Sequence, residues 1–190
     1  MSIYKFLGKR LFDIVTASIA FATLAPLLIL VAVCIFIEDS GPIFFSHQRI
    51  GRNGKPFLFY KFRSMPIGTP RVSSDQLGSI RLTKIGRIIR RTNIDELPQL
   101  INIIKGDMSV VGPRPSLLDQ YELISLRLKS GVLRLRPGLT GLAQINSFDG
   151  MSVQQKAFLD EKYCLTIGFW LDIMIILRTF LYLFVTPPVY

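Results

Sequence analysis

The sequence predicts a mixed α/β fold that is mostly helical, and three observations lead to this prediction. Apolar residues recur at helical spacing in several segments, a long apolar run of helical length lies near the N-terminus, and residues 43–65 carry the paired short runs of a β-hairpin. The 190 residues suffice for one domain with a hydrophobic core. The composition changes at Ser40, so we place a domain boundary between residues 1–39 and residues 40–190.

The composition is both apolar and strongly basic. Hydrophobic residues make up 49% of the chain, and the formal net charge is +10. This combination indicates a protein that lies on an anionic membrane surface or handles anionic substrates. Nucleic acid is not the expected partner, because the aromatic residues lie in apolar runs and no zinc spacing or helix-turn-helix signature occurs. Cys34 and Cys164 are expected to be free thiols, and His47 has no companion at metal-ligand spacing.

The N-terminal apolar run extends from Leu11 to Ile37, longer than the roughly 20 residues that span a bilayer as a helix. Pro26 near its middle is expected to break the helix. Basic residues flank both ends, and the positive-inside tendency cannot place both flanks of a spanning helix in the cytosol. We therefore favour a re-entrant helix over a spanning one, although these two features alone leave both open. Asp13 is expected to pair with Lys9 or Arg10 one turn back.

The predicted hairpin consists of a first strand at residues 43–45, a turn at residues 51–54 and a second strand at residues 57–62. If Leu58, Tyr60 and Phe62 face the core, Lys61 and Arg63 share the opposite face and can reach a phosphate. The alternative is a solvated strand face.

Several further segments predict helices. Residues 81–91 form a basic amphipathic helix that would bind lipid headgroups or steer a polyphosphate. Residues 116–133 and 152–166 also predict helices, and the apolar run at residues 169–185 predicts a helix in the membrane interface or packed on the first helix. Residues 66–80 predict a surface loop over a site, and residues 142–145 a short strand.

The segment from Thr92 to Pro115 carries the candidate chemistry. Asp95 and Glu96 are placed in the first turn of a predicted helix that ends at Gly106, and Arg114 follows between two prolines. Paired acids beside a restricted guanidinium suit phosphate chemistry, because the acids attack or hold a metal while the arginine neutralises phosphoryl oxygens. The alternative is that the acids only complement the helix dipole, and the local pattern leaves both open.

Ordered motifs extend along nearly the whole chain. They are Lys9-Arg10-x-x-Asp13, Arg49-x-Gly51-x-x-Gly54-x-x-Phe57, Tyr60-Lys61-Phe62-Arg63-Ser64-Met65, Thr83-Lys84-x-Gly86-Arg87-x-x-Arg90, Asp95-Glu96-Leu97-Pro98-Gln99-Leu100, Lys105-Gly106-Asp107-Met108-Ser109-x-Val111-Gly112-Pro113-Arg114-Pro115 and Arg136-Pro137-Gly138-Leu139-Thr140-Gly141-Leu142-Ala143-Gln144. With these motifs the chain resembles the bacterial sugar transferases, small monotopic polyprenyl-phosphate phosphoglycosyl transferases that begin polysaccharide and glycoprotein glycan assembly. The chain differs in having Ala25-Pro26 where the family often has Ser-Pro.

The resemblance implies a small catalytic domain on the cytoplasmic face of the bacterial inner membrane, anchored by a re-entrant helix that breaks near Pro26. It implies transfer of a sugar-1-phosphate from a UDP-sugar to polyprenyl (undecaprenyl) phosphate with release of UMP. Asp95 is implied as the nucleophile that forms a covalent phosphosugar intermediate, and Glu96 as the ligand of Mg²⁺. The residues expected to bind substrate and phosphate are Lys61, Arg63, Arg90, Arg114, Arg136, Gln144 and Asp160.

The expected partners are thus a UDP-sugar, polyprenyl phosphate and an anionic lipid bilayer, while a homo-oligomer is left open. Two alternatives remain. One is the same transfer by direct displacement in a ternary complex, with Asp95 as a base. The other is a non-catalytic membrane-surface adaptor whose basic helix binds anionic lipid. No segment of the sequence identifies the sugar or the glycan pathway.

Overall fold

A computed structural model describes residues 4–69, 82–146 and 151–185. Helices predominate and the strands are short, as predicted. In chain order the elements are a π-helical turn Tyr4–Gly8, α1 Lys9–Glu38, β1 Phe44–Ile50, a 3₁₀ turn Arg52–Gly54, β2 Pro56–Phe62, α2 Lys84–Arg91, a 3₁₀ turn Ile94–Glu96, α3 Gln99–Lys105, β3 Ser109–Val111, α4 Tyr121–Lys129, a 3₁₀ turn Val132–Arg134, β4 Gly138–Thr140, α5 Leu142–Asn146, α6 Val153–Thr166 and α7 Phe169–Val185.

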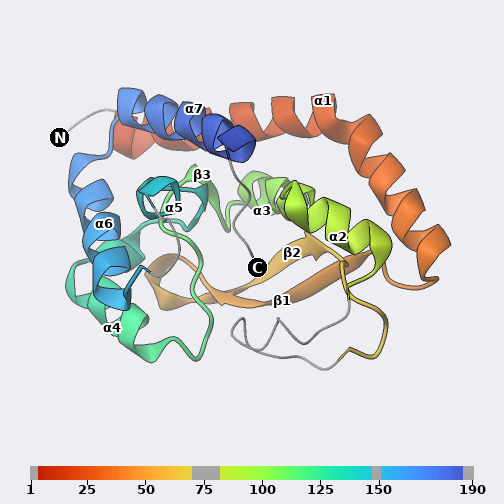
Figure 1. The fold of residues 1–190 in the computed structure, drawn as a ribbon. Coiled ribbons are helices and arrows are strands. Elements are labelled where there is room, and N and C mark those ends of the chain that lie inside the picture. Colours follow the sequence, from red (N-terminus) through yellow and green to blue (C-terminus); the bar gives the residue numbers. More distant parts are fainter. Residues whose placement is uncertain (1–3, 70–81, 147–150, 186–190) are drawn as a thin grey trace.

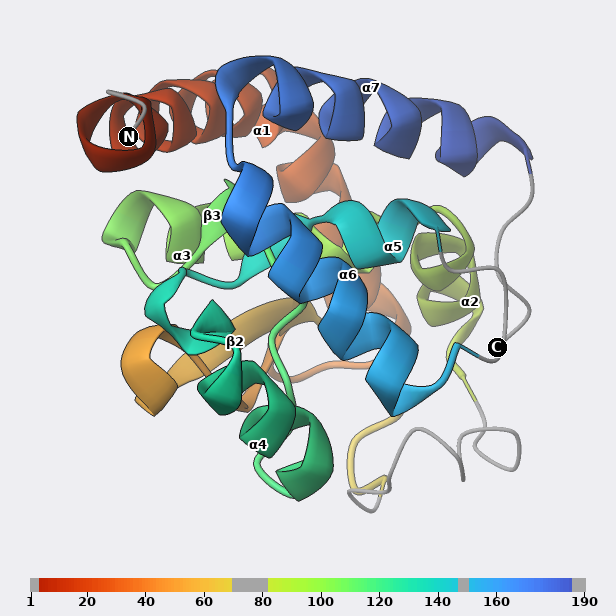
Figure 2. The same ribbon diagram turned by 90° about the vertical axis from the view of Figure 1, so that its left-hand side faces the viewer.

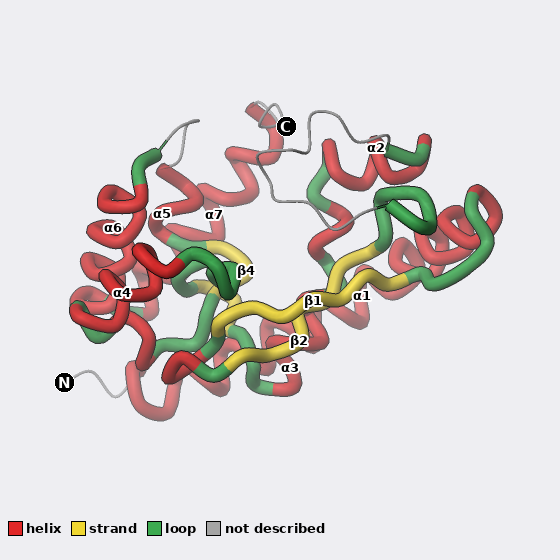
Figure 3. Tube along the Cα trace, turned by 90° about the horizontal axis from the view of Figure 1, so that it is seen from below, coloured by secondary structure: helices red, strands yellow, loops and turns green. Residues whose placement is uncertain are grey.

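The elements form layers. Helix α7 and the first half of α1 lie along one face, and the hairpin of β1 and β2 lies on the opposite face (Figures 1 and 3). The second half of α1 descends along the side toward the hairpin (Figure 1). Between them are α3 and the parallel pair of β3 and β4. Helix α6 descends along the side from α7 to α4 (Figure 2). Helix α7 and the first half of α1 therefore share one face of the molecule (Figure 1).

Helix α1 is continuous through Pro26 but bends near its middle (Figure 1). The expected break is therefore a bend. Pro26 has no N–H for the carbonyl of Ala22, and its ring crowds that carbonyl. The Thr23 hydroxyl donates to the carbonyl oxygens of Ile19 and Ala20 at 2.9 and 3.1 Å, a pattern that also bends helices. Among the described residues, α1 is the one helix long and apolar enough to cross a membrane.

The first half of α1 is part of the protein core. Ala17 is fully buried in a cluster that contains Phe59, Ile103 and Ile175, so α1, β2, α3 and α7 meet there. The second half contributes to a smaller cluster with Phe62 of β2 and residues of α2. The predicted boundary between residues 39 and 40 falls where α1 ends, and it stays a prediction.

The hairpin prediction is confirmed, with β1 and β2 antiparallel and Gln48 opposite Leu58. The expectation holds for Phe62, which is 3% exposed, but not for Leu58, because Leu58 is 49% exposed whereas Phe59 is only 2% exposed. The reason lies in α3, whose Asn102 side chain donates to the carbonyl oxygen of Leu58 and accepts from the amide of Tyr60. These bonds attach the free edge of β2 to α3, and Phe59 packs in the cluster that contains Leu100 and Ile103 of α3.

The remaining helix predictions are confirmed, with shorter bounds for α2, α4 and α6 and with the predicted bounds for α7. Helix α2 begins after Thr83, whose side chain accepts from Gly86 N, while Arg81 and most of the predicted loop lie outside the described residues. The strand predicted at residues 142–145 is wrong, because this segment forms α5. The strand lies just before it, where the backbone of β4 pairs with β3 and Gly112.

Candidate active site

The two carboxylates lie in a 3₁₀ turn, Ile94–Glu96, and not in the first turn of α3 as expected. Asn93 precedes the turn in the left-handed conformation, at φ 54°. Pro98 follows it and cannot donate a backbone hydrogen bond, so the regular helix begins only at Gln99. The predicted helix end is confirmed at Gly106, whose φ of 101° favours glycine.

Two separate segments converge on this turn. Lys61 of β2 places Nζ 2.7 Å from Glu96 Oε1 and 3.5 Å from Asp95 Oδ2. Arg114, which follows β3, places Nη2 2.8 Å from the same Glu96 oxygen. The tertiary structure therefore brings two of the predicted cationic residues to the acid pair. If the two acids only complemented a helix dipole, these cations would not be needed beside them.

The two carboxyl groups have different electrostatic environments. Burial raises the pKa of Asp95, and the attraction of Lys61 offsets this only in part. Burial would also raise the pKa of Glu96, but Arg114 and Lys61 outweigh it and hold that pKa far below its usual range. Glu96 is thus ionised throughout the physiological pH range. The protein stabilises the negative charge of Asp95 less than that of Glu96.

The backbone around Arg114 is held by a buried ion pair. Arg127 donates through Nε and Nη2 to Asp160 Oδ2 at 2.9 and 2.6 Å, and through Nη1 to the carbonyl oxygen of Arg114 at 2.8 Å. Asp160 therefore acts on the site through Arg127. Close packing adds a second restraint, because a Cβ on Gly112 would lie 2.6 Å from the carbonyl oxygen of Arg136.

Asp160→Asn is expected to lower the free energy of unfolding by roughly 3–5 kcal/mol, because the buried charge of Arg127 loses its partner. Arg127 and Asp160 are only 4% and 1% exposed. Thermal unfolding of the full chain in detergent measures the loss, and Asp119→Asn, at an exposed position, serves as the control. Equal melting temperatures for the two variants would contradict the structural role of this pair.

The other predicted cations on this side occupy distinct places. Arg90 of α2 donates to Ser64 Oγ at 2.9 Å and is close enough to Asp95 to lower its pKa in part. Arg63 is 9% exposed and donates to the backbone carbonyl of Asp39, where α1 ends. Its described contacts thus join the C-terminal end of α1 to the hairpin.

Arg136 lies at the far end of α3, where its Nε donates to the carbonyl oxygen of Gly106 at 2.8 Å. Gln144 of α5 has both amide atoms buried and without a hydrogen-bond partner among the described residues. An amide in this position has donor and acceptor capacity available for a ligand. The structure therefore keeps Gln144 as a binding candidate and separates Arg136 from the acid pair.

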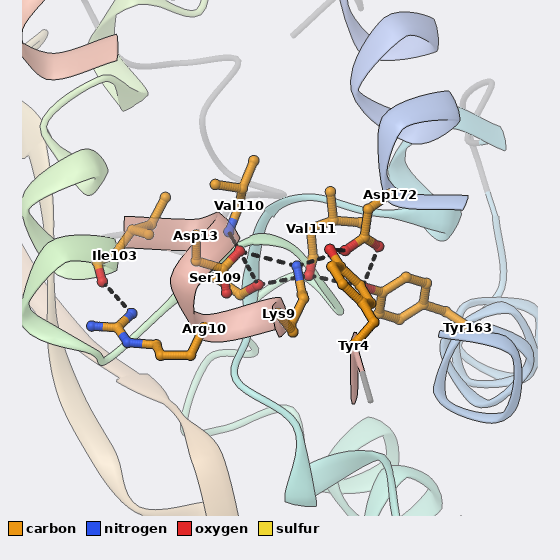
Figure 4. Close-up of polar contacts among 10 residues, drawn as sticks. All are labelled: Tyr4, Lys9, Arg10, Asp13, Ile103, Ser109, Val110, Val111, Tyr163 and Asp172. Atoms are coloured by element: carbon orange, nitrogen blue, oxygen red, sulfur yellow. Dashed lines mark hydrogen bonds and ion pairs between the residues drawn. The ribbon is translucent and has the colours of Figure 1, made fainter. Parts of the chain in front are cut away.

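A polar network at the start of α1 was only partly predicted. Lys9 Nζ lies 3.0 Å from Asp13 and 2.9 Å from Asp172 of α7, which confirms the expected pairing of Asp13 (Figure 4). Asp172 also accepts from the hydroxyls of Tyr4 and Tyr163 at 2.6 and 2.7 Å. The sequence signal for this network was an isolated acid in each of two apolar helices.

The acid pair fits Mg²⁺ in composition. Among the described residues, no group of three or more His, Cys, Asp or Glu side chains is arranged to hold a metal. Mg²⁺ is commonly bound by one or two carboxylates, and water and substrate phosphates complete its octahedral coordination. Glu96 and Asp95 together supply this number of carboxylates.

A carboxylate pair set among cations, beside a long apolar helix, defines a membrane-associated enzyme. The chain belongs to the bacterial sugar transferase family, whose model matches residues 4–186.

Three curated relatives illustrate this family. The UDP-glucose:undecaprenyl-phosphate glucose-1-phosphate transferase of Caulobacter vibrioides is 41% identical over 97% of this chain and 72% of its own length. The galactosyl transferase CpsE of Streptococcus agalactiae is 40% identical over 94% of this chain and 43% of its own length. The UDP-N-acetylgalactosamine-undecaprenyl-phosphate N-acetylgalactosaminephosphotransferase of Aeromonas hydrophila is 37% identical over 93% and 43%.

Proposed function

We propose that this enzyme transfers a sugar-1-phosphate from a UDP-sugar to polyprenyl phosphate, most simply undecaprenyl phosphate, and releases UMP. The single observation that carries the proposal is the placement of Asp95 and Glu96 within reach of Lys61 and Arg114. The two relatives named as undecaprenyl-phosphate sugar-phosphate transferases support it. The different sugars in the names of the relatives leave the donor sugar of this chain open.

The proposed mechanism has two displacements. An oxygen of the Asp95 carboxylate attacks the sugar-linked phosphorus, and the bond from that phosphorus to the UMP oxygen breaks. An oxygen of polyprenyl phosphate then attacks the same phosphorus, and the bond to Asp95 breaks, which regenerates the carboxylate. The raised pKa of Asp95 fits this role, because a carboxylate whose charge is poorly stabilised is more nucleophilic when ionised.

The surrounding residues offset negative charge. Lys61 and Arg114 are placed to neutralise phosphoryl oxygens, which otherwise repel the attacking carboxylate. Arg127 and Asp160 keep the backbone of Arg114 in position. Glu96 with Asp95 would hold Mg²⁺, which supplies further neutralisation of the diphosphate when bound.

The proposed membrane arrangement is monotopic. Helix α1 enters one leaflet, turns at the bend near Pro26 and returns, so that both basic flanks stay on the cytoplasmic face. The apolar side chains exposed on α1 and α7 support contact with lipid. This arrangement brings Asp95 to the depth at which the phosphate of a polyprenyl phosphate lies.

A direct test is UMP release from a panel of UDP-sugars by the full chain in vesicles with and without undecaprenyl phosphate. We expect one or a few donors to give sustained UMP release that requires the lipid. Vesicle binding with no turnover of any donor would favour the adaptor alternative and overturn the proposal.

The dependence of kcat/KM on pH should report the ionisation of Asp95. We expect the acid limb of kcat/KM to lie above the ordinary aspartate pKa of about 3.9, because the nucleophile must be ionised and burial raises its pKa. Removal of Lys61 takes away a charge that lowers this pKa, so Lys61→Gln should move the acid limb to higher pH. Lys105→Gln is the matched control at an exposed position. An acid limb that Lys61→Gln leaves unmoved would contradict the assignment.

A further inference from the structure

A second cationic site lies at the start of α1. A cavity of about 100 Å³ opens there between the N-terminal segment, the hairpin turn and the loop before β4. Its lining combines one acid, Asp13, with five basic side chains: Lys5, Lys9, Arg52, Arg134 and Arg136. The volume is sufficient for a small anion such as a phosphate group.

The acid in the cavity wall, Asp13, already accepts hydrogen bonds from other protein groups. Asp13 is 1% exposed, and its Oδ1 accepts from Lys9, from Ser109 Oγ and from Val110 N, each at 3.0 Å (Figure 4). The second partner of Lys9 is Asp172, which lies outside the lining. These two acids neutralise part of the charge, and the remaining cations have no acidic partner in the lining.

Several donors in the cavity remain available. Arg136 and Arg52 each use Nε for a backbone carbonyl, that of Gly106 and of Arg134 respectively. Among the described residues, their terminal nitrogens and the whole guanidinium of Arg134 have no hydrogen-bond or ion-pair partner. Burial and the like charges of Arg52 and Arg10 lower the pKa of Arg136, so an anion placed among these groups would relieve repulsion.

The cavity is distinct from the acid pair. The turn with Asp95 precedes α3, whereas Arg136 bonds to Gly106 just after α3. The 7 residues of this helix separate its two ends by roughly 10 Å. None of the lining residues contacts Asp95 or Glu96 in the described ion pairs and hydrogen bonds.

The cavity also lies where the apolar surface begins. Leu11 in the first turn of α1 is 65% exposed, and Trp170 at the start of α7 is 79% exposed. Tryptophan favours the membrane–water interface, and Lys9 at the cavity precedes Leu11 by only two residues. An anion in the cavity would therefore lie near the level of lipid headgroups.

We propose that this cavity is a binding site for a phosphate group, separate from the transfer site. Arg52, Arg134 and Arg136 supply guanidinium donors that match phosphate oxygens, and Lys5 and Lys9 supply point charges. The phosphate can belong to an anionic phospholipid headgroup or be free in solution. The proposal does not depend on the transfer reaction.

The test uses the full chain in phosphatidylcholine nanodiscs and follows its melting temperature. One arm replaces part of the lipid with phosphatidylglycerol, and the other adds inorganic phosphate against chloride at equal ionic strength. The cavity variant is Arg52→Gln with Arg134→Gln. The matched control is Lys55→Gln with Lys129→Gln, which removes the same charge from exposed positions outside the cavity.

We expect at least one arm to stabilise the wild type and the control, and the cavity variant to bind the same probe roughly tenfold more weakly or worse. The arm that responds identifies a lipid-borne or a free phosphate. If the double variant melts early without probe, Arg134→Gln alone is used, because its side chain makes no bond to the described protein. No stabilisation in either arm, or equal losses in the control, would overturn the proposal.

Discussion

Asp95→Asn is expected to abolish UMP release and to prevent any trapped phosphosugar adduct, with a loss of roughly 10³-fold or more. The asparagine amide has the shape of the carboxylate but lacks the ionised oxygen that attacks phosphorus. Asp95 is 5% exposed and its burial already disfavours the charge, so a neutral amide should leave the fold intact. Rate measurements are paired with thermal unfolding to verify this.

The exchange of labelled UMP into UDP-sugar, without lipid acceptor, separates the two transfer mechanisms. Only a covalent intermediate supports exchange before the acceptor binds, so wild type should catalyse it and Asp95→Asn should not. Asp119→Asn, an exposed aspartate, is the matched control and should exchange normally. Full activity of Asp95→Asn would rule out the covalent role, and wild-type turnover without exchange would favour the ternary complex.

Glu96→Gln is expected to raise the Mg²⁺ concentration needed for half-maximal activity and to reduce kcat by roughly 10²-fold. The variant removes the carboxylate that Lys61 and Arg114 share at 2.7 and 2.8 Å. Both cations then lose the anchor that holds them beside Asp95, and the proposed metal loses a ligand. The decisive measurement is a Mg²⁺ titration of UMP release at saturating UDP-sugar.

The control for this experiment is Glu122→Gln, at an exposed position on α4. We expect its Mg²⁺ titration to match that of wild type. An unchanged Mg²⁺ requirement in Glu96→Gln would eliminate Glu96 as a metal ligand, even if kcat fell because Lys61 and Arg114 had moved. The titration midpoint and kcat therefore distinguish a metal-binding role from a positioning role.

Local sequence patterns were sufficient to predict the elements whose apolar residues recur with a clear helical or strand period. The apolar helix, the hairpin and the terminal helix are confirmed because their side-chain spacing is a property of adjacent residues. Short elements were less predictable. The 3₁₀ turn at Asp95 depends on Pro98, which delays the start of the regular helix. The strand lies before Leu142 instead of after it because the backbone of β4 pairs with Gly112. Both effects override weak local preferences.

The sequence by itself determined the long apolar helix, the acid pair and the arginine between two prolines, because each is encoded within a few neighbouring residues. Only the tertiary structure decided which partners these groups have. Asp160 reaches Arg114 through Arg127, and Asp172 meets Lys9 across 163 positions of the chain. Such contacts come from the packing of distant elements around one core, and the spacing of residues along a single chain carries no direct record of them.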